Sequence, residues 1–191
     1  MSEEYGILGA EKSEVVRGLA TAAGDLDGAA AEVGVYQGHT SRIIARALPD
    51  RKVFCFDTFS GCPNADLHDV HVNGDFADTS LEQVRQRLRD CPNAIVRQGY
   101  FPETAVDLPE KFCFVHVDGD TYRTTLDAID VFWPRLVPGG YLVFDDWDWI
   151  HCPGVNQAIA ERLPDIQRLH PTRNQAVLRK PAAGTSGAGG V

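Results

Sequence analysis

The sequence has few basic residues, and this shortage limits the partners that the protein can have. Its 191 residues contain 18 Lys and Arg against 27 Asp and Glu, which gives a formal net charge of -9. A surface that follows a nucleic-acid backbone needs an excess of positive charge. We therefore expect no nucleic acid partner and look to a small-molecule substrate instead.

Long apolar segments are also missing. No apolar run approaches the ~20 residues that a membrane-spanning helix needs. The N-terminal stretch "MSEEYGILGAEKSE" is acidic and polar, whereas a secretory signal has a basic region followed by an apolar one. These absences predict a cytoplasmic protein without a membrane partner.

The cysteines form no recognisable framework. There are five of them, widely spaced and without a CxxC pair, so neither a zinc knuckle nor a set of disulfides is indicated. Cys55 and Cys113 lie inside apolar runs, where a thiol stays protonated and inert. We interpret most of the cysteines as buried or incidental thiols.

Strand-like and helix-like segments alternate along the chain, which predicts an α/β protein with a mostly parallel sheet covered by helices. Nearly continuous apolar runs, typical of strands covered on both faces, occupy residues 29–35, 52–58, 94–100, 112–118 and 141–146. Apolar residues three or four apart predict helices at 11–24, 40–48, 80–91, 124–136 and 155–163.

The C-terminal part differs from this pattern. Residues 166–171 and 175–180 flank "TRN", which predicts an antiparallel hairpin at the edge of the sheet. The final stretch consists almost entirely of Pro, Gly, Ala, Ser and Thr, a composition too poor in apolar residues to pack. We expect one domain over residues 1–181 and a disordered tail over residues 182–191.

The stretch "AEVGVYQGHTSRII" predicts a nucleotide site. A strand carries Glu32 near its end, turns through Gly34 and Gly38, and enters a helix. Such glycines let a ligand approach the backbone near the helix N-terminus. The dinucleotide fingerprint needs a further glycine where Tyr36 stands. A carboxylate at the strand end instead suits S-adenosylmethionine, which carries an ammonium and a sulfonium.

The second strand supports this reading. "FCFDTF" ends in Asp57, which lies 23 positions beyond Gly34, close to the place of a ribose-binding acid in such folds.

Two further strands run directly into pairs of carboxylates, in "VHVDGDTY" and "YLVFDDWDW". In a parallel sheet the ligand crevice lies beyond the carboxyl ends of the strands. Asp118, Asp145 and Asp146 would converge there as hard oxygen ligands without a histidine or thiol, a set that suits Mg²⁺. A divalent cation would relieve the repulsion among these acids.

At these residues the sequence resembles the macrocin O-methyltransferase (TylF) family of S-adenosylmethionine-dependent enzymes. The resemblance runs from about Ala31 to Ala158, and its most specific part is "FVHVDGDTYRTTLDAIDVFWPRLVPGGYLVFDDW". It implies a class I methyltransferase fold, which has a Rossmann-like, seven-stranded sheet whose final strand is antiparallel. It also implies methylation of sugar hydroxyls in natural-product biosynthesis.

The resemblance further implies roles for particular residues. Cofactor contacts are expected at Glu32, Gly34, Gly38, Asp57, Gly99 and Asp118. Mg²⁺ ligation is expected from Asp118, Asp145 and Asp146, with Asp120 as the general base. Relatives that act on macrolide or aminocoumarin sugars have longer N-terminal segments that cap the site and help to form a dimer. A homodimer in which a partner chain closes the site is the corresponding expectation here.

The predicted function is therefore Mg²⁺-dependent O-methylation of a sugar or another vicinal diol. A catechol-like aromatic acceptor would use the same carboxylates, and a cofactor-binding relative that lacks methyl transfer would keep the fold. A nicotinamide-dependent oxidoreductase is disfavoured by Tyr36. His68, His71 and His151 are alternative bases in loops near the crevice, whereas His116 is expected in the core.

Overall fold

The computed structural model describes residues 6–63 and 65–182, and these residues form a seven-stranded sheet. Its order is β3-β2-β1-β4-β5-β7-β6, and the five strands from β1 to β5 run parallel to one another. The predicted α/β class and the mostly parallel sheet are confirmed. The strands are β1 Ala29–Val33, β2 Val53–Asp57, β3 Ala94–Gln98, β4 Phe112–Val117, β5 Leu136–Asp145, β6 Arg168–Leu169 and β7 Gln175–Arg179.

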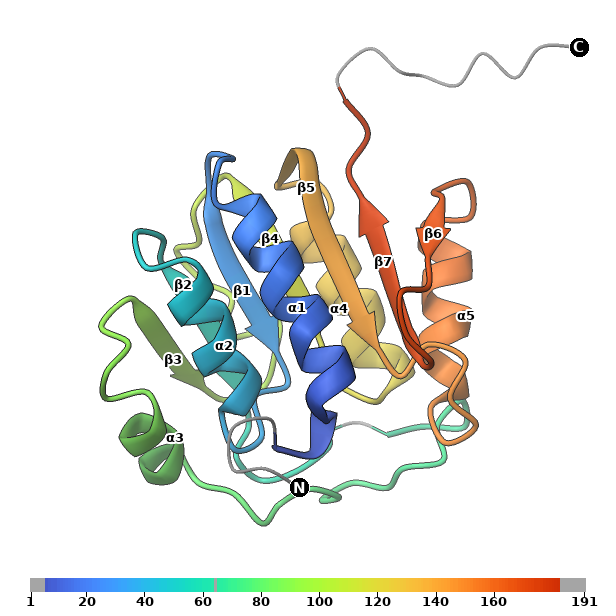
Figure 1. Cartoon of the computed structure of the whole chain (residues 1–191). Helices are drawn as coiled ribbons and strands as arrows, with labels where there is room; N and C mark the ends of the chain where they lie inside the picture. Colours follow the sequence, from blue (N-terminus) through green and yellow to red (C-terminus); the bar gives the residue numbers. More distant parts are fainter. Residues whose placement is uncertain (1–5, 64, 183–191) are drawn as a thin grey trace, which may run out of the picture.

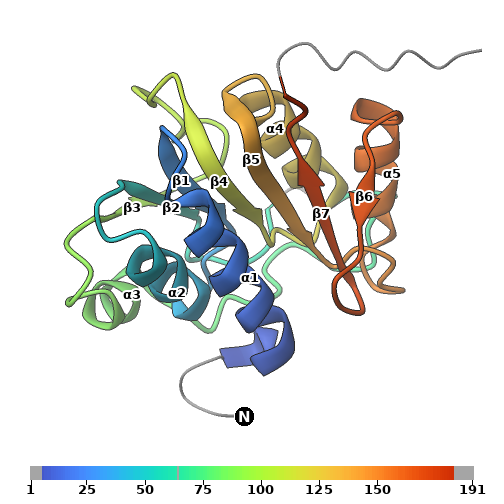
Figure 2. The same cartoon turned by 45° about the horizontal axis from the view of Figure 1, so that its top comes forward.

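Helices cover both faces of the sheet (Figures 1 and 2). One buried cluster joins side chains of α1, α2 and α3 to one face, and a second joins α4 and α5 to the other. Every residue of the central strands β1 and β4 is buried, as their continuous apolar runs require. The helices are η1 Gly6–Leu8, α1 Ala10–Ala23, α2 His39–Ala47, α3 Leu81–Arg87, α4 Tyr122–Phe132 and α5 Pro153–Arg162.

The predicted C-terminal hairpin is also confirmed. Strand β7 lies antiparallel to both β5 and β6, and Leu142 of β5 stands opposite Leu178 of β7. The sheet therefore has the antiparallel strand next to β5 that the resemblance implies. The predicted tail at 182–191 lies outside the described residues except for Ala182.

Several element boundaries differ from the sequence prediction, three of them by four or more residues. Helix α4 ends at Phe132 rather than at residue 136, because the next residues form a turn before β5. Helix α3 ends at Arg87 rather than at residue 91, because the next residues form a turn in which Leu88 caps the helix. Strand β5 begins at Leu136 rather than at Tyr141. The early start of β5 has a structural cause. The backbone N–H of Gly139 donates to the carbonyl of Lys180, and the N–H of Lys180 donates to the carbonyl of Gly140, so the residues of the predicted turn pair with the chain that follows β7.

The carboxyl ends of the parallel strands share one edge of the sheet, and the long connection from β2 to α3 crosses this edge toward the start of α5 (Figure 1). Hydrogen bonds fix the far part of this connection, since Asp69 accepts from the backbone N–H of Tyr122 at 2.8 Å. Within the described ranges, no helix combines the length and the apolar character that crossing a membrane would take.

Candidate active site

The turn after β1 is built around Gly34, whose backbone is left-handed with φ of 86°. A Cβ atom at this position would lie 1.9 Å from the carbonyl oxygen of Asp118. Only glycine lets the ends of β1 and β4 approach so closely. Gly38 also has positive φ, 81°, and it is the N-cap of α2. Gly34 lines a cavity, whereas Gly38 is not among the lining residues and a Cβ atom there would meet Val84.

Asp57 holds the same turn in place from the end of β2. Its Oδ2 accepts hydrogen bonds from the backbone N–H groups of Val35 and Tyr36, each at 2.7 Å. Its Oδ1 accepts from the N–H of Phe59 at 2.7 Å. A carboxylate oxygen has two acceptor sites, so Oδ1 keeps one for a ligand hydroxyl.

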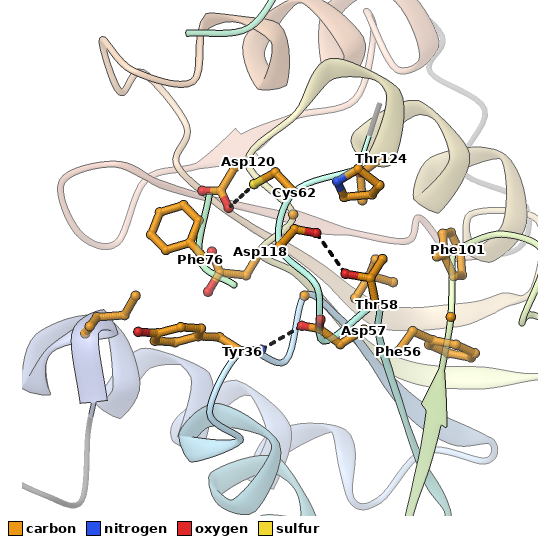
Figure 3. Close-up of a pocket in the computed structure, with 17 residues that line it drawn as sticks. Tyr36, Phe56, Asp57, Thr58, Cys62, Phe76, Phe101, Asp118, Asp120 and Thr124 are labelled. Atoms are coloured by element: carbon orange, nitrogen blue, oxygen red, sulfur yellow. Dashed lines mark hydrogen bonds between the residues drawn. The ribbon is translucent and has the colours of Figure 1, made fainter. Parts of the chain in front are cut away.

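A cavity opens beyond the ends of β1, β2 and β4, and it brings the expected cofactor residues together with the acids (Figure 3). Phe56 and Phe101 form part of its apolar wall, and Gly99 leaves space near the end of β3. Of the expected site residues, Gly34, Asp57, Gly99, Asp118 and Asp120 line this cavity.

Glu32 does not line it. Its side chain is fully buried on the α2 side of the sheet, where Ser41 donates to Oε2 and Nδ1 of His116 lies 3.0 Å from Oε1. The carboxylate thus ties β1 to β4 and α2, and His116 is a core residue as expected. Nε2 of His116 has no hydrogen-bond partner within the described part of the chain.

The carboxylates after β4 and β5 meet at the mouth of the cavity. One oxygen each from Asp118, Asp120 and Asp146 lie within 4.8 Å of one another. Asp120 and Asp146 have left-handed backbones with φ of 57° and 60°. Such strained positions are typical of functional sites and cost roughly 1–3 kcal/mol each.

The crowding shifts the pKa values of these acids. Burial and then the charges of Asp145 and Asp146 raise the pKa of Asp118 well above its usual range. Burial and then the charge of Asp146 do the same to the pKa of Asp120. A cation among these groups would stabilise their ionised forms.

Asp145 differs from the other acids because it already has a cationic partner. The ammonium of Lys12, from α1, lies 2.8 Å from its Oδ2, and the two side chains are 16% and 5% exposed. Burial and then Asp146 raise the pKa of Asp145 to about 6, although Lys12 opposes this shift. The structure therefore differs by one residue from the predicted set of metal ligands, which was Asp118, Asp145 and Asp146. The three acids whose oxygens lie close together include Asp120 in place of Asp145.

Three residues at the site were not predicted as a group. The thiols of Cys62 and Cys152 each lie 3.8 Å from an oxygen of Asp120, and His71 approaches the same carboxylate. The predicted ligand set of Asp118, Asp145 and Asp146 did not include Asp120, and the histidine and the thiols gather around Asp120. The contacts span 58 and 32 residues along the chain, and no spacing motif announces them.

Comparison with known proteins identifies the family. A family model described as "Methyltransferase domain" matches residues 31–147, which contain the glycine turn, Asp57 and all of the clustered acids. The chain belongs to this methyltransferase family.

Relatives of the methyltransferase domain confirm the narrower resemblance. The chain is 33% identical over 140 residues to 8-demethyl-8-(2,3-dimethoxy-alpha-L-rhamnosyl)-tetracenomycin-C 4'-O-methyltransferase of Streptomyces olivaceus, covering 61% of this chain and 51% of that protein. It is 30% identical over 148 residues to demethyldecarbamoylnovobiocin O-methyltransferase of Streptomyces niveus, covering 68% of this chain and 56% of that one. The match spans about half the length of these relatives.

Solved structures show the same fold. The O-methyltransferase NovP superimposes with a TM-score of 0.80 at 23% identity, covering 93% of this chain and 82% of that one. The calicheamicin methyltransferase CalS11 gives a TM-score of 0.72 at 20% identity, with 87% and 77% covered. The class I methyltransferase fold that the resemblance implied is thereby confirmed.

Proposed function

We propose that this protein is an S-adenosylmethionine-dependent O-methyltransferase whose acceptor is a small molecule with a vicinal diol, such as the sugar of a natural product. One observation carries the proposal: the cavity lined by Gly34, Asp57 and Gly99 opens directly onto Asp118 and Asp120. Cofactor and acceptor sites would then adjoin. The relatives named for methylation of glycosylated antibiotics support the same acceptor class.

The described residues fit S-adenosylmethionine. Gly34 leaves the backbone of the turn uncovered at a position where any side chain would collide with the residue after β4. Asp57 keeps one acceptor site at its Oδ1 for a ligand hydroxyl. Tyr36 occupies the position where a dinucleotide site needs glycine, and its hydroxyl is anchored on Asp78 at 2.9 Å. This arrangement supports the methyl donor over a nicotinamide cofactor. When bound, S-adenosylmethionine supplies a methyl group activated by its sulfonium.

The acids also fit Mg²⁺, which prefers oxygen ligands. Asp118 and Asp146 belong both to the expected ligand set and to the trio that the geometry gathers, and they would hold the ion. Asp145 would join them only where Lys12 releases it. When bound, Mg²⁺ supplies a Lewis acid that lowers the pKa of an acceptor hydroxyl.

Asp120 is the proposed base. It lines the cavity beside Asp118, and a cation bound among these acids would favour the ionised form of Asp120, which accepts a proton. Glu32 and Gly38 would act on the cofactor indirectly, since Glu32 fixes β1 against β4 and Gly38 begins α2.

The test is methyl transfer from labelled S-adenosylmethionine to a panel of vicinal-diol glycosides and catechols, with Mg²⁺ present. Asp120→Asn should reduce turnover by roughly 10²–10⁴-fold, the usual contribution of a general base, and should spare S-adenosylhomocysteine binding. Asp148→Asn, in the exposed part of the next loop, is the matched control and should remain active. Full activity of Asp120→Asn would remove this residue from the mechanism, and transfer to catechols alone would reject the sugar acceptor.

We further propose a homodimer that covers the mouth of the site. Large apolar side chains are exposed on the two loops at this edge, among them Leu67 at 90% and Ile150 at 83%. In a dimer these side chains would be buried between the two chains, and this burial would stabilise the interface. Light scattering of the active protein tests the idea, and a monomer with intact activity would reject it.

A further inference from the structure

Asp120 is surrounded by softer donors as well as by carboxylates. Cys62 lies 3.8 Å from its Oδ2 and Cys152 lies 3.8 Å from its Oδ1. One ligand atom each from His71, Asp120 and Cys152 lie within 4.8 Å of one another. These three residues come from the β2–α3 connection, the end of β4 and the start of α5, so the fold gathers them from three separate segments. Figure 3 shows Asp120 and Cys62 facing each other at the rim of the cavity.

One pair of atoms in this group is spaced as in a tetrahedral metal site. Zinc binds a thiolate at about 2.3 Å and a carboxylate oxygen at about 2.0–2.2 Å. At a tetrahedral angle these lengths place the sulfur and the oxygen roughly 3.6 Å apart. The observed separation of 3.8 Å between Cys152 Sγ and Asp120 Oδ1 is close to this value. A small side-chain movement would bring this pair to the tetrahedral spacing, and a ring nitrogen of His71 lies within 4.8 Å of the ligand atoms of both residues.

His71 has the supporting contact that metal-binding histidines usually have. Its Nδ1 lies 3.0 Å from Oδ2 of Asp75, which also accepts the backbone N–H of Val72. The hydrogen bond from Val72, and after it the one from His71, lower the pKa of Asp75. The Asp75 carboxylate therefore accepts the Nδ1 hydrogen of His71 and leaves Nε2 of the imidazole available to a metal. The other two candidate histidines lack this arrangement: His68 packs on the ring of Tyr122 and His151 lies beside Trp149.

Cys152 is 1% exposed, and burial followed by the charges of Asp146 and Asp120 raises the pKa of its thiol. A divalent cation at this position would reverse the local field, because a coordinating thiol loses its proton to the metal. The same negative charge that disfavours the free thiolate would attract the ion.

We propose that His71, Asp120 and Cys152 form a binding site for a thiophilic divalent cation such as Zn²⁺ or Co²⁺, with the fourth position open. This site shares Asp120 with the cluster of Asp118, Asp120 and Asp146, but its histidine and thiol ligands distinguish it from the all-oxygen set that is suited to Mg²⁺. Because Asp120 is the proposed base, a thiophilic ion would inhibit methyl transfer. That consequence rests on the proposed function, whereas the binding site itself does not.

The test is a titration of the complete protein with Co²⁺, followed by absorption spectroscopy. The site predicts a thiolate-to-cobalt charge-transfer band in the near ultraviolet that Zn²⁺ displaces. Cys152→Ser should abolish the band, and His71→Ala should weaken Co²⁺ binding by at least about tenfold, in the range seen for lost metal-site interactions. Cys91→Ser is the matched control, because Cys91 is a buried thiol in the other core cluster, and it should leave the band unchanged.

Binding of S-adenosylhomocysteine to each variant verifies that the fold survives and tests the cofactor site separately. If Co²⁺ produces no such band in the unaltered protein, or if the band persists in Cys152→Ser, the proposed site is refuted. Loss of the band in Cys91→Ser would equally refute it, since the thiolate would then come from elsewhere.

Discussion

The close approach of β1 and β4 at Gly34 makes a quantitative prediction. In Gly34→Ala the new Cβ would stand 1.9 Å from the carbonyl oxygen and 2.6 Å from the carbonyl carbon of Asp118. Ordinary contact begins at 3.4 Å, so the first of these distances is short by 1.5 Å. The obstacle is backbone and cannot rotate away. Either strand end must move, and Asp118 moves with it.

The cost has two parts. The left-handed backbone costs alanine roughly 1–3 kcal/mol, and forcing atoms into a packed region costs roughly a further 1–3 kcal/mol. We therefore expect Gly34→Ala to lower the free energy of unfolding by about 2–6 kcal/mol in urea titrations followed by circular dichroism. It should also abolish S-adenosylhomocysteine binding, because the displaced strand end lines the cavity.

Gly74→Ala separates the two contributions. Gly74 also has positive φ, 95°, but a Cβ there would meet nothing within 4 Å. It should show only the backbone cost of roughly 1–3 kcal/mol and should bind S-adenosylhomocysteine. If Gly34→Ala is no less stable than Gly74→Ala and binds the ligand normally, the close approach of the two strands does not shape the site.

Three further substitutions test other parts of the site. Lys12→Met should raise the Mg²⁺ affinity measured by calorimetry at least about tenfold, because it removes a positive charge that repels the ion and frees Asp145. An unchanged affinity would place the ion elsewhere. Glu32→Ala should lower the free energy of unfolding by roughly 2–5 kcal/mol, since it leaves His116 and Ser41 without their buried partner. A change below about 1 kcal/mol would contradict the structural role given to Glu32. Asp57→Ala should weaken S-adenosylhomocysteine binding at least about tenfold, because the backbone N–H groups of Val35 and Tyr36 lose their acceptor. Unchanged binding would show that the turn after β1 keeps its shape without Asp57.

The fold could be predicted because its signals are local. Continuous apolar runs identified the strands, three-to-four spacing identified the helices, and the hairpin around "TRN" was recognisable from its two short runs. The early start of β5 was missed because it depends on Lys180 pairing with Gly139 and Gly140, some 40 residues away. Turn-like residues there would otherwise predict a loop.

The site was predictable to the level of strand ends but not of side-chain direction. Asp118 and Asp120 lie at the cavity because they follow β4 directly. Glu32 is still inside its strand, where alternate side chains face opposite sides of the sheet, and it points toward His116 instead. Lys12 reaches Asp145 across 133 residues, a contact that depends on how α1 packs and that no motif encodes.

The central claim is that the glycine turn and its acids hold S-adenosylmethionine. The most direct test is calorimetric titration of S-adenosylhomocysteine into the purified protein, first with Mg²⁺ and then with EDTA, because it requires no knowledge of the acceptor. We expect saturable binding under both conditions, since Gly34 and Asp57 shape the cavity through backbone contacts that need no metal ion. Absence of binding under both conditions would contradict the account and would reduce the family relationship to a shared fold.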